Sequence, residues 1–154
     1  MMSAEKKLLD LLRTRQQASS PTVREVIQAK QWIADVESLM VDIKKWLRGA
    51  EKEGLVRVKS REVTLVEPKA GKYNLPALTL TTPGYARVLL DPAGLEVIGA
   101  KGRVDLASGP KKVMLLRFAP KHWHFTWPAN QPGEWESERL TEESFYKVLR
   151  WLIE

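Results

Sequence analysis

The stretch from Pro21 to Pro68 constrains the fold of this chain more than any other part. An amphipathic helical run follows Pro21, with apolar residues spaced three and four apart, and Gly54 marks its end. Two alternating, β-branched segments come next, Leu55 to Val58 and Val63 to Val66. The four residues 59–62 between them have the length of a hairpin turn. The order of elements is therefore a long helical run followed by a predicted hairpin.

A shorter helix is predicted before this stretch, from Glu5 to Gln16, because four leucines cluster on one side of it. Pro21 ends it, and Ser19 or Ser20 can cap the next helix. The sequence leaves open whether the second helical run breaks near residues 30–31. A break produces a helix-turn-helix, whereas an unbroken helix would pair with the first one as a helical hairpin.

The run from Ile43 to Arg48, followed by Gly54, Leu55 and Val56, resembles the end of a recognition helix and the start of the wing in the winged helix-turn-helix superfamily. The resemblance covers about residues 5–67. It implies docking on duplex DNA, with six basic residues touching the phosphate backbone: Lys44, Lys45, Arg48, Arg57, Lys59 and Arg61. Acidic residues depart from the pattern, because on the second helix they would face phosphate: Asp35, Glu37 and Asp42.

The second half of the chain predicts an antiparallel meander. Short strand-like runs are separated by turn-forming residues, and they span residues 77–81, 85–91, 95–99, 103–106, 112–118 and 122–127. A polar loop over residues 128–139 then leads to a last helix capped by Thr141. The predicted class is α+β, with a winged-helix-like domain at residues 1–68 and a sheet with a C-terminal helix at residues 72–154. The Pro68 to Lys72 segment is the predicted boundary.

Charge and composition narrow the class of protein. The net charge of +6 favours a polyanionic partner, and the absence of cysteine excludes disulfides and thiolate metal sites. No apolar run approaches the roughly 20 residues of a membrane-spanning helix, and no apolar signal core follows the first residues. We therefore expect a cytoplasmic protein without a membrane partner.

Three smaller motifs are candidate sites. His122 and His124 share one face of a predicted strand, but no third ligand is visible, so we predict no metal site. Arg103 and Asp105 share another strand face, which favours a structural pair over a partner contact by Arg103. Trp135 lies in the polar loop, where it either folds back on the sheet or anchors a partner.

No set of residues in the sequence suggests catalysis or a cofactor. The leading hypothesis is a non-enzymatic, DNA-binding and regulatory protein whose C-terminal domain senses a ligand, forms a homodimer or binds a partner. The alternative is a protein interaction module, an adaptor or inhibitor, that uses a winged-helix fold without binding DNA. A contiguous basic face would favour DNA, whereas dispersed basic residues would favour a protein partner.

Overall fold

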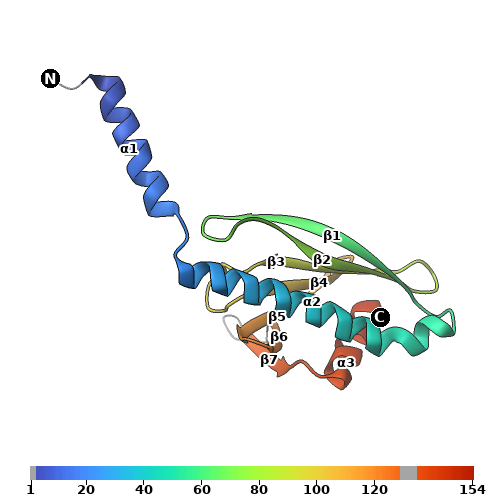
Figure 1. Ribbon diagram of the computed structural model, residues 1–154. Coiled ribbons are helices and arrows are strands. Elements are labelled where there is room, and N and C mark those ends of the chain that lie inside the picture. Colours follow the sequence, from blue (N-terminus) through green and yellow to red (C-terminus); the bar gives the residue numbers. More distant parts are fainter. Residues whose placement is uncertain (1–2, 129–134) are drawn as a thin grey trace.

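The computed structural model describes residues 3–128 and 135–154, and it confirms the α+β class (Figure 1). Seven antiparallel strands form one sheet in the order β1 to β7, so the predicted meander is confirmed. The helices are α1 (Ala4–Ser19), α2 (Val23–Lys52) and α3 (Glu142–Ile153). The strands are β1 (Arg57–Glu67), β2 (Gly71–Thr81), β3 (Arg87–Gly94), β4 (Arg103–Ser108), β5 (Lys111–Ala119), β6 (His122–Pro128) and β7 (Trp135–Arg139).

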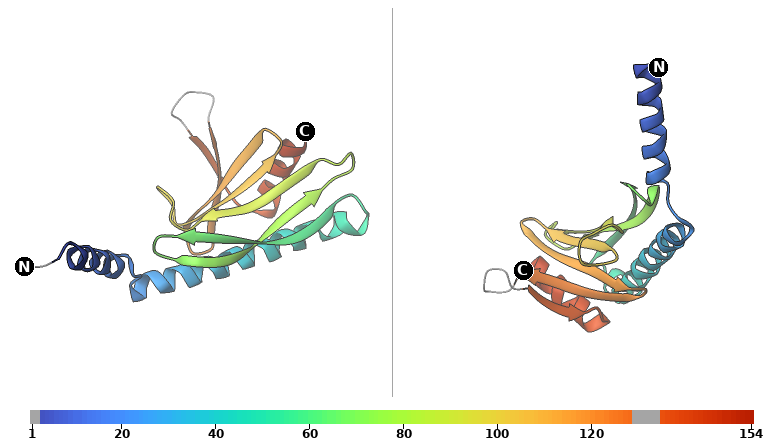
Figure 2. Two further views of the ribbon diagram at one scale, coloured as in Figure 1. Left: turned by 90° about the horizontal axis from the view of Figure 1, so that it is seen from above. Right: turned by 90° about the vertical axis from the view of Figure 1, so that its left-hand side faces the viewer.

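Helix α2 is unbroken along its whole length and lies against the sheet (Figure 1). Its apolar stripe is buried and consists of Trp32, Val36, Leu39, Met40, Ile43 and Leu47. Thr22, rather than Ser19 or Ser20, is its cap: Thr22 and Glu25 each accept a hydrogen bond from the other's backbone amide. The bond from the Thr22 amide holds the pKa of the Glu25 carboxyl below its ordinary value. The unbroken helix does not pair with α1, because α1 extends away from the body (Figure 2).

Strand β1 replaces the predicted wing. Residues 59–62, which were expected to form a turn, lie inside β1, and that expectation is wrong. The strand pairs with β2 over its full length, from Arg57 opposite Thr81 to Glu67 opposite Gly71. The alternation of burial along β1 changes phase between Lys59 and Ser60, which are both exposed, so the phase change falls within the polar stretch that was expected to turn. The turn lies at residues 68–70, and Gly71, which follows it and begins β2, adopts a φ of 74°.

The segment from Leu95 to Ala100, expected in part as a strand, is a loop with a single bridge between Val97 and Ala100. The carboxylate of Glu67 accepts hydrogen bonds from the backbone amides of Leu95 at 2.9 Å and Glu96 at 2.7 Å. These two amides are therefore satisfied by a side chain instead of a neighbouring strand.

The same carboxylate continues a polar network into the core. The Tyr73 hydroxyl donates to Glu67, and the indole nitrogen of Trp32 donates to the Tyr73 oxygen at 3.1 Å. Burial and the neighbouring Glu67 carboxylate raise the pKa of the Tyr73 hydroxyl well above its ordinary value. Gly102 lies directly beside the Trp32 ring, where an added Cβ would come within 2.3 Å of a ring carbon. The network and this close contact hold the β3–β4 loop against α2.

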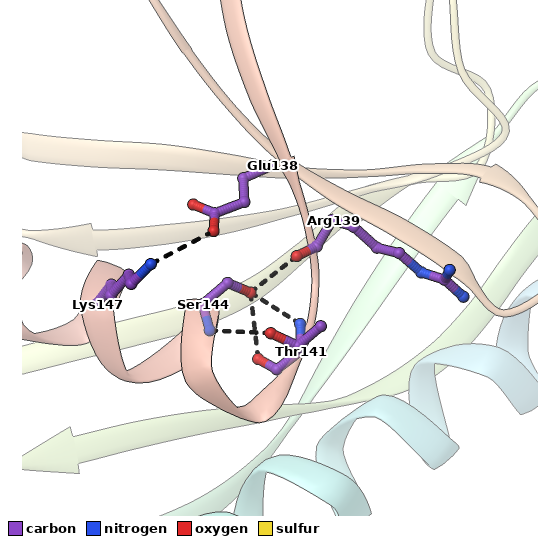
Figure 3. Close-up of polar contacts among 5 residues, drawn as sticks. All are labelled: Glu138, Arg139, Thr141, Ser144 and Lys147. Carbon is purple, nitrogen blue, oxygen red and sulfur yellow. Dashed lines mark hydrogen bonds and ion pairs between the residues drawn. The ribbon is translucent and has the colours of Figure 1, made fainter.

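Helix α3 begins as the sequence predicted (Figure 3). The Thr141 hydroxyl accepts a bond from the Ser144 amide at 3.0 Å, and the Ser144 hydroxyl accepts one from the Thr141 amide at 2.8 Å. The Ser144 hydroxyl also donates to the Arg139 carbonyl at 2.9 Å, so it is satisfied although the residue is buried. Arg139 closes β7, a strand that lies in the segment expected to be a loop. The cap thus ties α3 to the last strand.

One hydrophobic cluster unites both halves of the chain. It includes Trp32 and Leu47 from α2, Leu75 from β2, Phe125 from β6 and Phe145 from α3. The boundary predicted at residues 68–72 coincides with the turn between β1 and β2, and both strands belong to the same sheet. Residues before and after that turn therefore share this core.

A buried ion pair crosses the core between α2 and β5. The Nε of Arg117 donates to Asp35 at 2.7 Å, and only 4% and 8% of the two side chains are exposed. Asp35 also accepts a bond from the Lys121 amide at 3.0 Å, and Arg117 donates to the Lys101 carbonyl at 2.8 Å. Asp35 therefore points into the protein, and the expectation that it faces phosphate is wrong.

Replacing Asp35 by alanine is expected to lower the free energy of unfolding by about 3–5 kcal/mol, because Arg117 would remain buried without its counter-ion. Chemical denaturation of the full chain measures this change. The matched control is Glu154→Gln, which breaks a surface pair with Arg150 whose side chains are 83% and 56% exposed, and which should leave the midpoint nearly unchanged. The double variant Asp35→Leu with Arg117→Leu should lose less stability than Asp35→Ala. Equal effects of Asp35→Ala and Glu154→Gln would contradict the role of the buried pair.

Candidate interaction surface

Helix α1 carries a leucine stripe that the rest of the described chain does not cover. Every described side chain from Ser3 to Ala18 is exposed, and none belongs to the hydrophobic cluster. The stripe consists of Leu8, Leu9, Leu11 and Leu12, which are 53%, 40%, 50% and 51% exposed. An amphipathic helix whose apolar face meets only solvent is typical of a surface that binds another molecule.

Local interactions form α1 and set it apart from the body. Ser3 caps its first turn by accepting a bond from the Lys6 amide at 3.2 Å. Ser20 and Pro21 then separate it from α2, and the residue before a proline is biased towards extended backbone. The Lys69 ammonium donates a hydrogen bond to the Ala18 carbonyl at 3.1 Å and so joins the last turn of α1 to the body. Figure 2 shows that the rest of α1 points away from the sheet.

The first turns of α2 extend this apolar surface. Val23, Val26 and Ile27 are 78%, 40% and 50% exposed, although Val36 on the same helix is fully buried. The sheet therefore covers α2 only from about Trp32 onwards. We call the four α1 leucines together with these three α2 residues the exposed apolar surface.

The basic residues expected to touch DNA have unequal positions. Lys45 and Arg48 are exposed in the last turns of α2, and Arg57 and Lys59 are exposed on β1, whereas Lys44 is half-buried. Arg61 is engaged within the sheet: it donates to Asp91 and to the Thr79 hydroxyl, each at 2.7 Å, and to the Leu78 carbonyl at 3.1 Å. The guanidinium of Arg61 thus already has a carboxylate partner, and this residue is a poor candidate for phosphate contact.

The other candidate residues from the sequence are Arg103, Trp135 and the two histidines. Arg103 and Asp105 form the predicted pair, with Nε and Oδ1 3.0 Å apart, and Lys112 approaches the same carboxylate at 3.2 Å. The Trp135 side chain lies outside the described residues, so neither interpretation of it is tested. His124 packs edge-on against Phe118 with the ring centroids 5.5 Å apart. Within the described ranges, no three His, Asp or Glu side chains form a metal-ligating group.

A cavity of about 500 Å³ lies near the start of α2, between this helix, the β1–β2 turn and the β3–β4 loop. Its polar lining includes Glu25, Gln28, Lys69, Glu96 and Lys101. Three of these already have partners: Glu25 accepts from Thr22, and the Lys69 amide donates to Glu96 at 3.1 Å. None of the described residues that line it is a serine, cysteine or histidine, so its walls offer no pair of nucleophile and imidazole base.

Sequence reasoning missed the buried Asp35–Arg117 pair and the Glu67–Tyr73–Trp32 network. A signal for the first was present, because Asp35 interrupts the apolar stripe of α2 between Trp32 and Val36. A buried acid predicts a cationic partner, but the sequence does not show which of many basic residues is near.

No described helix is long and apolar enough to span a membrane.

Replacing a leucine by alanine, once in the core and once on α1, tests whether the α1 stripe lies outside the core. Leu47→Ala is expected to lower the free energy of unfolding by about 2–5 kcal/mol, because Leu47 is 4% exposed and its removal leaves a cavity. Leu12→Ala makes the same chemical change at a residue that is 51% exposed, and it should leave the melting temperature of the body within about 1 °C. Comparable losses in the two variants would show that α1 packs on the body in solution.

Comparison with known proteins identifies no relative of this chain. No protein-family model, no curated protein and no solved structure matches the chain. What the surface does must therefore be inferred from the arrangement of its own residues.

Proposed function

We propose that this protein is a non-enzymatic protein interaction module, in which a packed body presents α1 as a docking helix. The observation that carries the proposal is the leucine stripe of α1, whose four members are 40% to 53% exposed. Burying these side chains against another protein would gain about 25 cal/mol for each Å² of apolar surface removed from water. An amphipathic helix laid into an apolar groove is a recurrent mode of protein recognition.

The body suits the role of a rigid platform. Its core includes residues from α2, the sheet and α3, and the Asp35–Arg117 pair fixes α2 to β5. Helix α1 can therefore bind or release a partner without any loss of buried contacts in the body. The described residues that line the cavity near α2 include no serine, cysteine or histidine, which supports the non-enzymatic part of the proposal.

Site-specific photocrosslinking in the cells of origin tests this function. A photoreactive residue at Leu9 should form discrete protein adducts, because the leucine stripe would be in contact with a partner. The same residue at Lys6, on the polar side of α1, is the matched control and should give few adducts. Adducts of twice the mass identify a second copy, and other masses identify a different protein. Equal yields from the two positions, or none from either, would overturn the docking role of α1.

Duplex DNA is a second candidate partner, which the resemblance to winged helices implies. The supporting observation is a group of exposed basic residues near the α2–β1 connection: Lys45, Arg48, Arg57 and Lys59. Among the described residues none of these four takes part in an ion pair, so their charges are not neutralised within the chain. Exposed basic side chains supply most of the sequence-independent affinity for a duplex.

A salt titration with random duplex DNA separates this candidate from the first. Replacing Arg57 and Lys59 together by glutamine should weaken binding to every sequence and reduce the slope of log affinity against log salt by about two. Arg61→Gln is the control on the same strand, and it should leave the slope unchanged because Asp91 already binds its guanidinium. If the unmodified chain shows no binding at low salt, the DNA role is excluded.

A further inference from the structure

We propose that the leucine stripe of α1 binds α1 of a second copy of this chain, with the two helices antiparallel. The inference rests on the proposed docking role of α1 and names its partner. The spacing of residues along the stripe supports the inference, because the leucines occupy the same positions when the helix is read in the reverse direction.

The stripe is symmetric about its centre near Asp10. Glu5 precedes Leu8 and Leu9 by three and four residues, and Arg15 follows Leu11 and Leu12 by four and three. Residues three and four apart lie on one helix face, so Glu5 and Arg15 occupy the two ends of the leucine stripe. Reversing the chain direction exchanges Leu8 with Leu12 and Leu9 with Leu11. A two-fold axis at the centre would therefore place leucine against leucine along the whole contact.

Charge selects the antiparallel orientation. In that orientation Glu5 of each copy lies beside Arg15 of the other copy, so both ends of the contact carry opposite charges. In a parallel pair, Glu5 would face Glu5 and Arg15 would face Arg15, which is repulsive. The interaction between the two helix dipoles is also favourable only when the helices are antiparallel, because the positive end of each then lies beside the negative end of the other. Arg13 and Asp10 form an ion pair within α1, at 3.6 Å, and this pair can remain on the polar side.

The small size of the contact sets the expected affinity. Four half-exposed leucines on each copy bury less than the roughly 1,200 Å² of a standard interface, so the dimer belongs to the weak class. Geometry permits the contact, because α1 projects from the body (Figure 2) and all four leucines of its stripe are exposed.

Sedimentation equilibrium of the full chain, up to about 500 µM, is the first test, since a weak interface needs high concentration. We expect concentration-dependent dimers. Glu5→Arg and Arg15→Glu should each weaken association by about tenfold, because two attractive pairs become repulsive. The double variant, Glu5→Arg with Arg15→Glu, should recover the original affinity within about twofold. Lys6→Glu changes the net charge as much as Arg15→Glu but lies on the polar side, so it should have little effect.

Spin-label distances test the orientation independently. The chain contains no cysteine, so a single cysteine introduced at Lys6 or Gln17 is labelled uniquely. At a rise of 1.5 Å per residue, an antiparallel pair separates the two Gln17 positions by about 21 Å along the axis and the two Lys6 positions by about 12 Å. A parallel pair makes the two distances similar.

The outcomes separate this inference from the docking role on which it rests. A chain that stays monomeric at every concentration, or charge variants that the double change does not rescue, would overturn self-pairing. If photocrosslinking at Leu9 still gave adducts with another protein, α1 would have a different protein partner and the docking role would stand. If neither self-association nor any Leu9 adduct were found, both proposals would fail.

Discussion

The buried ion pair between Asp35 and Arg117 is the constraint on which the rest of this structure depends. It joins the middle of α2 to β5, and the same two side chains bind the Lys121 amide and the Lys101 carbonyl. A single pair thus positions one helix, one strand and two loops. Removing either charge leaves the other buried without its counter-ion, which is costly in a medium of low dielectric constant, so the pair favours this position of α2 on the sheet.

That position of α2 decides which apolar residues remain outside the core. The sheet and α3 cover its stripe from Trp32 to Leu47, while Val23, Val26 and Ile27 extend past the sheet. Helix α1 continues beyond this end, and its described side chains are exposed and lie outside the hydrophobic cluster. The core is complete without α1, so its leucine stripe is available to a partner.

The sequence predicted elements well wherever local signals agreed. Helix α1, the meander of β2 to β6 and the Thr141 cap of α3 all follow from periodicity and capping residues. Prediction failed where a distant side chain intervened. The Glu67 carboxylate accepts hydrogen bonds from the amides of Leu95 and Glu96, which lie in a loop where a strand was expected. Pairing with β2 keeps Ser60 and Arg61 in one strand, where a wing turn was expected. Among the basic residues predicted to touch DNA, Arg61 forms an ion pair with Asp91 on β3, a contact between strands that the sequence pattern does not show.

The sequence by itself determined the α+β class, the order of the elements and the amphipathic character of α1, because these depend on residues within a few positions of each other. Only the tertiary structure decided that α2 is unbroken, that β1 belongs to the common sheet and that the α1 stripe stays uncovered. Each of these depends on contacts between residues far apart in the chain, such as Asp35 with Arg117 and Trp32 with Tyr73. The physical reason is that burial of a stripe requires a partner surface, and periodicity shows that a stripe exists without showing what covers it.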